Sequence, residues 1–440
     1  MLPNKNDLIT NTDTMSSTSE PRILSSASSS ASGSGTSNSS STSSPPEYKV
    51  VPHDSFDTMD LDDDVLRGLY GYGFTKPSKP QRTGIVPLTK RKDVVFSCES
   101  GTGKTGTFVV GTLNCIDPTV QAPQVVIINP IRELAHQTAD VFRAIGKYLK
   151  VSESVTGVKV MTATGGTPVS EDLKALRNGA QVIVGTPGRI FDLLGRGLNL
   201  KHLKYLILDE ADKLFESGFA EQISEILGTG KFPDTTSLAL FSATLPEIVQ
   251  EMAEKYLKKD RIKILIPKEE VKLEGIKQFY IDCEKPEWKN DVLADLYKYL
   301  SFGQGIIFAS TKFTVEKLAK WMVDQNFTVE YIHGDMLAPE RAKRMQDFRT
   351  GAVRILISTD VLARGIDVQA VSTVINYEMP SERDDYWHRI GRTGRYGKKG
   401  VSINLIAGAD EMSKMKEIES HYSMVIPMLP EDLSVLTSSK

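Results

Sequence analysis

Residues 206–212 read Leu-Ile-Leu-Asp-Glu-Ala-Asp, an apolar run that ends in three carboxylates. Upstream, residues 100–105 read Ser-Gly-Thr-Gly-Lys-Thr, a glycine-rich turn that also follows a β-branched run. Backbone N–H groups of such a turn bind phosphate oxygens at the start of a helix. Either segment alone also occurs by chance or as a solvated strand end, but both in this order predict a site for a nucleoside triphosphate.

The side chains of these two segments have distinct expected roles. Lys104 would bind the β- and γ-phosphates, and the Thr105 hydroxyl would coordinate Mg²⁺. Asp209 would hold the same ion through water, and Glu210 would accept a proton from the attacking water. The remaining residues of the turn are Ser100, Gly101, Thr102 and Gly103.

Short β-branched runs alternate with helical patterns along most of the chain. The runs expected to be strands in the first half are residues 94–96, 125–128, 182–184, 206–208 and 238–241. Those in the second half are residues 279–281, 305–308, 328–332, 355–357 and 374–376. Continuous apolar strands separated by helices predict an α/β fold, in which a parallel sheet is covered on both faces. We expect two such domains, 48–266 and 276–440, joined by the charged linker 267–275.

Length and charge limit the class of protein. With 440 residues the chain fits two domains and a tail, and its net charge of −3 excludes a globally basic nucleic-acid coat. Residues 16–44 contain 16 serines, so we expect the tail 1–47 to be disordered. Its use as a phosphorylated docking segment is an alternative to a bland solvated extension.

Cysteine and apolar content indicate the compartment. The three cysteines, at 98, 115 and 283, are an odd number without metal-like spacing, which favours a reducing environment. No apolar run approaches the roughly 20 residues of a bilayer span, and no signal peptide is evident. We therefore expect a soluble intracellular protein.

The spelling Asp-Glu-Ala-Asp resembles the DEAD-box ATP-dependent RNA helicases. Segments similar to further motifs of that family are residues 73–77 with Gln81, 130–135, 165–166, 186–189, 242–244, 307–308, 358–367 and 388–395. The resemblance spans roughly residue 56 to the C-terminus. Residues 66–70, 273–280 and 288–289 are most similar to translation initiation factor 4A and its nuclear and nucleolar relatives.

This resemblance implies two tandem RecA-like domains that bind ATP and Mg²⁺ between them. Phe56 would stack on the adenine, and the Gln81 amide would read its edge. Asp367 would bond the ribose. Arg392 and Arg395 would enter across the domain cleft as arginine fingers, so hydrolysis would require closure of the two domains.

The resemblance also implies RNA and coupling contacts. The residues expected to bind phosphates and 2′-hydroxyls of one strand are Arg132, Gly165, Gly166, Thr186, Pro187, Gly188, Arg189, Thr311, Thr359 and Arg364. The residues expected to couple ATP and RNA binding are Asp212, Ser242, Thr244, His388 and Arg389. Among these, His388 would reach the Asp212 carboxylate. The glycines also have a simpler interpretation as turn residues.

Five residues depart from the family pattern. Cys98 replaces an alanine, and Glu99 places a carboxylate beside the phosphate loop, where we expect it to point to solvent. Ile131 replaces a threonine whose hydroxyl would meet RNA, and Ala338 replaces a glutamine in a second-domain RNA motif. Pro80 stands beside Gln81. We therefore expect intact hydrolysis with a weakened hold on RNA.

Three functions fit this sequence. The leading hypothesis is an RNA-stimulated ATPase that unwinds or remodels RNA without sequence specificity in translation initiation, acting as a cytoplasmic monomer with a protein scaffold that bridges its domains. The alternatives are an ATP-gated RNA clamp in nuclear or nucleolar RNA processing and a structural paralogue with degraded RNA binding.

Overall fold

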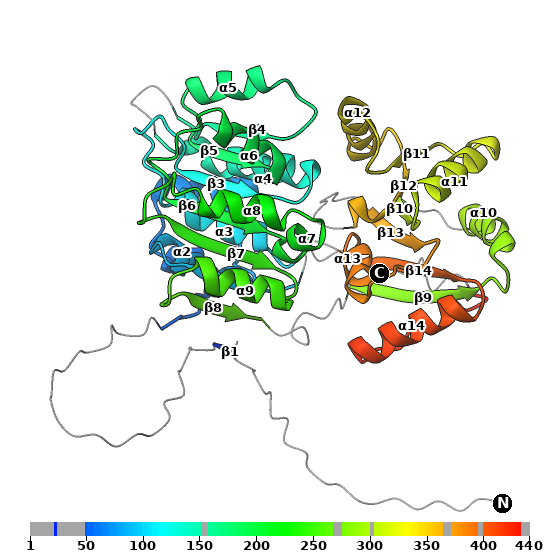
Figure 1. The fold of residues 1–440 in the computed structure, drawn as a ribbon. Coiled ribbons are helices and arrows are strands. Elements are labelled where there is room, and N and C mark those ends of the chain that lie inside the picture. The colour runs from blue at the N-terminus through cyan, green and yellow to red at the C-terminus, as the bar shows by residue number, and fades with distance from the viewer. Residues whose placement is uncertain are drawn as a thin grey trace, which may run out of the picture.

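The computed structural model describes residues 22–23, 49–99, 101–150, 156–266, 275–299, 303–363, 371–394 and 399–432. They form two α/β domains placed side by side (Figure 1). The predicted disordered tail and linker lie outside the described residues, apart from Arg22–Ile23 and Gly275. Because the two domain boundaries border these segments, they stay predictions.

Domain 1 is built on an eight-stranded sheet. Its strands are β1 (Arg22–Ile23), β2 (Val94–Ser97), β3 (Val125–Ile128), β4 (Val160–Ala163), β5 (Val182–Gly185), β6 (Tyr205–Asp209), β7 (Ser237–Ser242) and β8 (Ile262–Leu265). Their order is β1-β8-β2-β7-β6-β3-β5-β4, and all neighbours are parallel except β1 and β8. All five expected runs are strands here. The sequence analysis missed β1, β4 and β8: β4 lies at one edge of the sheet, and β8 pairs with β1 at the other. At Arg22–Ile23 the prediction of a disordered tail is therefore wrong.

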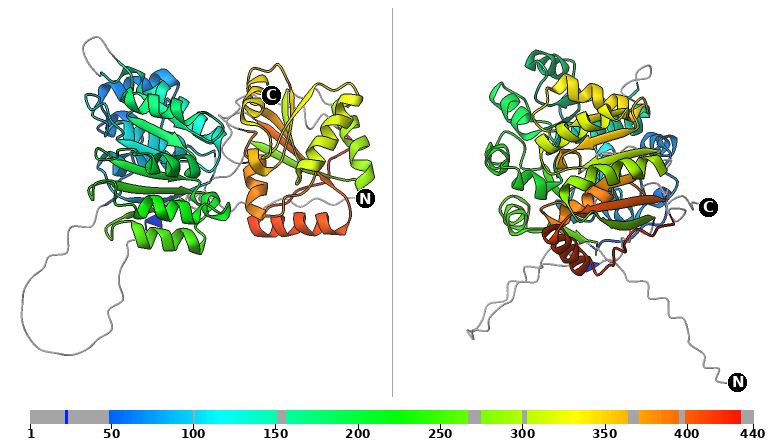
Figure 2. Two further views of the ribbon diagram at one scale, coloured as in Figure 1. Left: turned by 45° about the horizontal axis from the view of Figure 1, so that its top comes forward. Right: turned by 90° about the vertical axis from the view of Figure 1, so that its right-hand side faces the viewer.

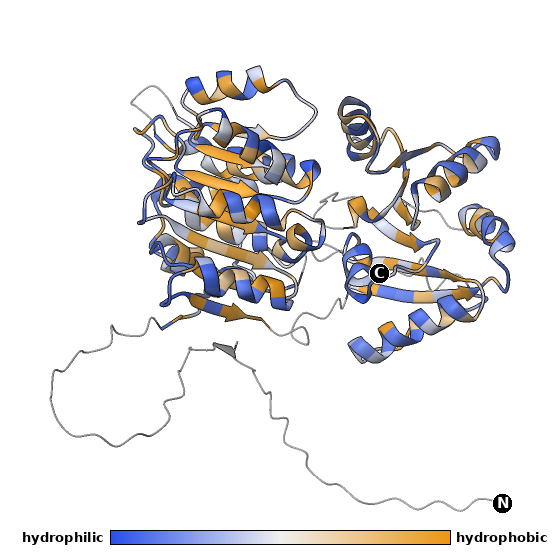
Figure 3. Ribbon diagram, viewed as in Figure 1, coloured by the Kyte–Doolittle hydropathy of each residue, from blue (hydrophilic) through white to orange (hydrophobic). Residues whose placement is uncertain are grey.

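Helices cover both faces of this sheet. They are α1 (Asp63–Tyr72), α2 (Lys79–Thr89), α3 (Lys104–Leu113), α4 (Arg132–Ile145), α5 (Val169–Arg177), α6 (Pro187–Gly195), α7 (Ala211–Glu216), α8 (Ala220–Gly228) and α9 (Glu247–Tyr256). Alternate strand residues enter two separate cores: Phe96 packs with α2 and α3, whereas Val95 belongs to the core of α6, α8 and α9. The strands are accordingly apolar on both faces (Figure 3).

Domain 2 repeats the design on six parallel strands. They are β9 (Ile276–Asp282), β10 (Gln304–Phe308), β11 (Val329–Ile332), β12 (Ile355–Ser358), β13 (Val371–Asn376) and β14 (Gly400–Ile406), in the order β11-β12-β10-β13-β14-β9. Its helices are α10 (Lys289–Tyr299), α11 (Lys312–Asp324), α12 (Ala338–Arg349), α13 (Arg383–Ile390) and α14 (Ala409–Tyr422). The predicted fold of two covered parallel sheets is confirmed (Figure 2).

The two domains touch through α4 and α12. The Arg341 guanidinium lies 2.6 Å from the Glu133 carboxylate, and both side chains are buried. Nearby, Gly166 has a φ of +88°, and a Cβ added there would lie 2.5 Å from the Cβ of Ala338. Glycine at 166 is therefore required by both the backbone and the close approach of domain 2. No helix in the described part of the chain is long and apolar enough to cross a membrane.

Candidate active site

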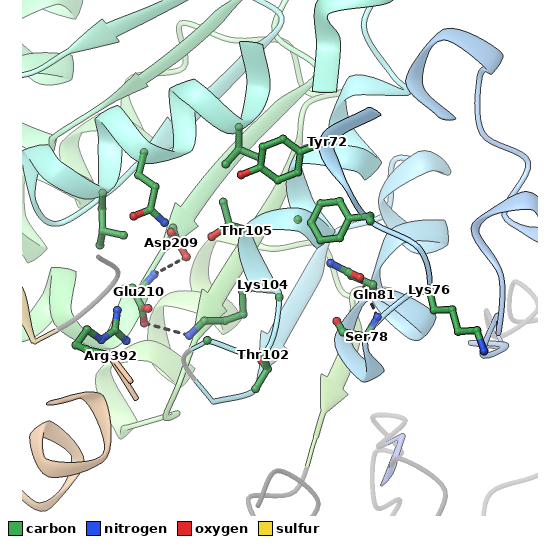
Figure 4. A pocket seen from close by; sticks show the side chains of 17 residues that line it. Tyr72, Lys76, Ser78, Gln81, Thr102, Lys104, Thr105, Asp209, Glu210 and Arg392 are labelled. Atoms are coloured by element: carbon green, nitrogen blue, oxygen red, sulfur yellow. Dashed lines mark hydrogen bonds and ion pairs between the residues drawn. The ribbon is translucent and has the colours of Figure 1, made fainter. Parts of the chain in front are cut away.

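A cavity of about 330 Å³ opens where the carboxyl ends of β2 and β6 meet the start of α3. This is the edge at which parallel α/β sheets bind ligands. Figure 4 shows the side chains that face it. They are Tyr72, Phe74, Lys76, Ser78, Gln81, residues 101–106, Leu134, Gln137, Val141, Asp209, Glu210 and, from domain 2, Arg392.

The phosphate loop leads directly into α3. Gly103 precedes this helix with a φ of +111°, and a Cβ there would lie 2.7 Å from the Ser78 hydroxyl. Only glycine fits such a backbone. Residues 101–106 all line the cavity, so the free N–H groups at the start of α3 are available to an anion. Ser100 of the predicted loop lies outside the described residues.

Three charged side chains meet at the floor of the cavity. The Lys104 ammonium lies 3.1 Å from the Glu210 carboxylate, and both are buried. Asp209 accepts hydrogen bonds from the Asn129 amide at 2.9 Å and from the Glu210 backbone N–H at 3.1 Å. Burial, reinforced by Glu210, raises the pKa of Asp209 to about 7. Burial is the largest single influence on the pKa of Lys104 and lowers it, but Glu210 and the neighbouring Cys98, Asp209 and Asp212 together raise the pKa above its usual value. Within domain 1, two carboxylates thus face one cation, Lys104, at the floor of the cavity.

Glu210 adopts a strained backbone. Its φ of 49° and ψ of 54° are left-handed, which costs a non-glycine residue on the order of 1–3 kcal/mol. This conformation makes the sharp turn from β6 into α7, and it directs the carboxylate towards Lys104. Strain of this kind is retained where the surrounding structure holds a functional side chain in place.

Gln81 lies at the other end of the cavity. Its amide oxygen accepts a hydrogen bond from the Ser78 backbone N–H at 2.9 Å, which closes a capping box at the start of α2. Pro80 occupies the first turn of that helix, where proline is tolerated because no N–H partner is lost. Pro80 therefore does not displace the motif. The amide nitrogen and the second lone pair of the oxygen remain able to read a base.

The prediction that Phe56 stacks on adenine is wrong. Phe56 is 1% exposed and packs edge-on against Tyr70 and Phe74 within the core of domain 1. Phe74 is the aromatic residue that lines the cavity, with Tyr72 at 5.5 Å between ring centroids. The signal was present in the sequence, because Phe74 belongs to the same motif as Gln81.

Domain 2 contributes Arg392 to the cavity, beside Glu210 (Figure 4). Arg392 is 1% exposed, and its Nε donates to the backbone carbonyl of His388 at 2.9 Å. The guanidinium is therefore oriented by the last turn of α13. Arg395, Asp367 and Arg364 lie outside the described residues.

The predicted coupling residues lie next to one another. The Ser242 hydroxyl accepts from the Asp212 backbone N–H at 3.1 Å, and the Thr244 hydroxyl donates to the Asp212 carboxylate at 3.0 Å. His388 is buried and lines a small cavity together with Thr244. A bond from His388 to Asp212 stays a prediction. Arg389 lies within domain 2, with Nε and Nη2 at 2.5 and 2.8 Å from the Asp360 carboxylate.

The residues predicted to bind RNA are used in two ways. Thr186 and Thr311 precede α6 and α11, and Arg132 lies against Gly166. Pro187 and Gly188 begin α6, whereas Gly165 and Thr359 lie just after β4 and β12. Arg189, in contrast, lies 2.5 Å from the Asp172 carboxylate and donates to the Thr167 carbonyl at 2.7 Å. Its first role is to fix two segments of domain 1.

The departures from the family pattern are placed as follows. Glu99 is 3% exposed, so the prediction that it points to solvent is wrong. Cys98 is buried, with its sulfur 3.2 Å from the Thr102 hydroxyl. Ile131 is the residue that precedes α4, and Ala338 begins α12 against Gly166.

Sequence reasoning also missed two polar contacts. Asn129 directly follows the apolar run of β3 and orients Asp209, so its place at a strand end was a usable signal. The Glu133–Arg341 pair joins residues that are far apart in the sequence. No local pattern predicts it.

Comparison with known proteins shows similarity to RNA helicases over nearly the whole folded region of this chain. The family model for DEAD/DEAH box helicases matches residues 78–252, and that for the helicase conserved C-terminal domain matches residues 288–397. The ATP-dependent RNA helicase eIF4A of Aspergillus clavatus is 47% identical over 384 residues, covering 87% of this chain and 94% of that protein. The eIF4A of Neurospora crassa is 46% identical with the same coverage.

Solved structures agree with these sequences. S. cerevisiae Dbp5 bound to RNA and ADP BeF3 has a TM-score of 0.78 and 34% identity, covering 88% of this chain and 98% of that one. Mss116p bound to ssRNA and AMP-PNP has a TM-score of 0.72 and 26% identity, covering 90% and 83%. With its two tandem RecA-like domains and its Asp-Glu-Ala-Asp strand end beside the phosphate loop, the chain belongs to the DEAD-box ATP-dependent RNA helicases.

Proposed function

We propose that this helicase remodels RNA during translation initiation in the cytoplasm, using ATP and Mg²⁺. The observation that carries the proposal is a nucleotide cavity lined by both domains, with Arg392 of domain 2 facing Lys104 and Glu210 of domain 1. The named eIF4A relatives support the pathway and the compartment, because they match over 87% of this chain.

The residues present fit Mg²⁺ carried by a nucleotide. No group of three or more His, Cys, Asp or Glu side chains forms a metal cluster within the described ranges. Mg²⁺ bound with nucleotide needs few protein ligands, since phosphates and water supply the rest. Asp209 and the Thr105 hydroxyl would hold it, and the surplus of buried carboxylate beside Lys104 favours a cation there. When bound, the ion would balance charge on the phosphates.

The protein side chains then divide the work of hydrolysis. Lys104 would exchange part of its contact with Glu210 for the phosphates. Glu210, released from that ion pair and held by its strained turn, would accept the proton of the attacking water. Arg392, fixed by the His388 carbonyl, would stabilise charge that develops during transfer. Arg395 would act with it.

RNA would be bound by both domains at the side of α4, α5 and α12. Arg132, Gly166 and Ala338 meet there across the domain junction, next to the Glu133–Arg341 pair. Because this junction and the nucleotide cavity form in one arrangement of the domains, ATP and RNA binding should favour each other. The strand would be gripped by its backbone, so sequence would not be read.

We also infer a protein partner that bridges the domains, with the helicase itself monomeric. Dbp5, a structural relative, has been solved bound to Gle1 and IP6, and in another structure bound to Nup159, Gle1, IP6 and ADP. A scaffold that fixes the distance between the two domains would favour the closed arrangement in which ATP and RNA are bound.

The test is steady-state ATP hydrolysis by the full chain with and without RNA of unrelated sequences. We expect strong stimulation, equal for all sequences, together with unwinding of short duplexes. Glu210→Gln is the inactive reference and should lose on the order of 10²-fold in turnover. Weak turnover with long-lived ATP-dependent RNA retention would instead indicate a clamp. No effect of RNA would refute the proposal.

A further inference from the structure

Glu99 stands at the boundary between the domains. It lies two residues after β2 and belongs to the loop that leads to Lys104, yet its side chain is 3% exposed. It lines a second cavity of about 10 Å³ together with residues of domain 2. Because such a volume holds roughly one water molecule, the side chains around it face one another across a few ångström.

The opposite wall of this second cavity is a rigid corner of domain 2. Trp387 of α13 and Tyr422 of α14 stack with ring centroids 4.7 Å apart and an interplanar angle of 23°. The Tyr422 hydroxyl donates to the Asp384 carboxylate at 2.9 Å. Asp384, Trp387 and Tyr422 all line the cavity that Glu99 enters. This corner presents both an aromatic surface and hydrogen-bonding groups to the phosphate loop.

Glu99 and Tyr422 interact electrostatically as well. Burial, then Asp384 and then Glu99 raise the pKa of the Tyr422 hydroxyl. The Glu99 carboxylate therefore lies within reach of a residue from the last helix of domain 2. Neither Glu99 nor Tyr422 is among the residues that line the nucleotide cavity.

The same corner orients the arginine of the nucleotide cavity. His388 lines the second cavity with Glu99, and its backbone carbonyl accepts from Arg392 Nε at 2.9 Å. One turn of α13 thus lines the cavity that Glu99 enters and also holds Arg392. A displacement of this turn by about 1 Å would move the guanidinium away from a productive position.

We propose that Glu99 is a positioning residue for the reaction, which seats the phosphate loop of domain 1 against the Trp387–His388–Tyr422 corner of domain 2 and thereby sets Arg392 beside the nucleotide. The inference rests on the proposed function, in which domain closure completes the site. The properties of Glu99 that matter for this role are the length and polarity of its side chain. The negative charge itself is a cost, because Asp384 is close and bound phosphates would add like charge.

The experiment compares four variants of the full chain with a matched control. The variants are Glu99→Ala, Glu99→Gln, Tyr422→Ala and the Glu99→Ala/Tyr422→Ala double variant. The control is Glu251→Ala, an exposed carboxylate on α9 of the same domain. The readouts are kcat and KM for ATP with saturating RNA, and the distance between dyes on the two domains with AMP-PNP and RNA.

We expect Glu99→Ala to lower kcat about tenfold, with KM changed less than about twofold, since interdomain coupling residues act on geometry more than on ground-state binding. Tyr422→Ala should do the same, and the double variant should be no worse than either single change. Glu99→Gln should restore at least half of the wild-type kcat, because it keeps length and polarity. Glu251→Ala should match the wild type.

Three results would overturn the proposal: additive losses in the double variant, a rise in KM alone, or a fully active Glu99→Ala. Equal melting temperatures would show that lost activity does not reflect unfolding. If the wild type lacked RNA-stimulated hydrolysis, the proposed function would fail while the dye distances still decided this inference. In that case, closure of the wild type but not of Glu99→Ala supports it, and equal closure of both refutes it.

Discussion

The nucleotide cavity and the residues expected to meet RNA use their charged side chains differently. In the cavity, Lys104, Glu210 and Arg392 all face one space. Among the RNA motifs, Arg189 pairs with Asp172 inside domain 1, and Arg389 of the coupling motif pairs with Asp360 inside domain 2. An arginine in a family motif can therefore serve a ligand or the scaffold, and the motif alone does not distinguish the two.

The difference has a physical origin. The carboxyl ends of β2 and β6 lie at the same edge of the sheet with only β7 between them, so the side chains that follow them line one cavity. The RNA motifs are spread over separate loops, and each loop needs its own internal support. A buried arginine provides that support when a carboxylate balances it, as Asp360 balances Arg389.

The largest expected effect tests whether Arg389 supports the fold of domain 2 or contacts a ligand. Arg389→Ala leaves the Asp360 carboxylate without its bidentate partner and removes hydrogen bonds to Asn376 and the Glu378 carbonyl. It should lower the free energy of unfolding by about 3–5 kcal/mol, the usual cost of breaking a buried ion pair. Urea titration of domain 2 unfolding measures this, with the exposed Arg383→Ala on the same helix as control. A stable Arg389→Ala that loses only RNA affinity would make Arg389 a ligand residue.

Replacing either of two aromatic residues, Phe74 and Phe56, by alanine should affect different properties of the protein. Phe74→Ala should weaken ATP binding by about 1–3 kcal/mol, the usual value of base–aromatic stacking, and should leave stability nearly unchanged. Phe56→Ala should instead lower stability by about 3–5 kcal/mol, as expected for an emptied core position. Titration with a fluorescent ATP analogue and thermal melting distinguish them. The reverse pattern would restore Phe56 as the adenine contact.

A smaller effect concerns pH. The folded protein keeps a proton on Asp209 up to a pKa of about 7, whereas the unfolded chain releases it near the ordinary value of 3.8. Between these values the folded state binds more protons, so this group makes stability fall as pH rises, and the effect levels off above about pH 7. Binding of Mg²⁺–ATP should release this proton. The affinity for Mg²⁺–ATP should therefore fall about tenfold for each pH unit below pH 7. Calorimetry in buffers of different ionisation enthalpy measures the release, and Asp209→Asn should abolish it.

The smallest effect is expected at Ile131, which precedes α4 with an extended backbone and gives that helix no side-chain cap. In Ile131→Thr, the hydroxyl can either cap the helix, raising stability by about 1 kcal/mol, or reach RNA and tighten binding several-fold. Ile131→Val is the control, because it has the shape of threonine without the hydroxyl. A variant that matches valine in both melting and RNA titration would show that the missing hydroxyl at 131 does not weaken the grip on RNA.

The sequence predicted most of the fold because continuous apolar runs are diagnostic of buried parallel strands. It missed β4, with its alternating burial, and β8 together with β1, the short strand of the tail that pairs with β8. It also predicted which residues line the phosphate end of the cavity, since the glycine-rich turn and the strand-end carboxylates are local patterns.

The rest depended on tertiary contacts. An upstream aromatic residue such as Phe56 gives no sign of whether it packs in a core or faces a ligand. Glu99 is buried in a cavity that domain 2 helps to line, and Arg189 is held by Asp172 and by the Thr167 carbonyl. None of these contacts can be inferred from the spacing along the chain.

The central claim is that Arg392 of domain 2 completes the nucleotide site of domain 1. Single-turnover ATP hydrolysis by Arg392→Ala, with and without saturating RNA, tests it most directly. We expect stimulation by RNA to disappear, lowering the RNA-dependent rate by on the order of 10²-fold or more, while affinity for AMP-PNP and the melting temperature stay close to those of the wild type. A variant that RNA still stimulates as strongly as the wild type would contradict the account.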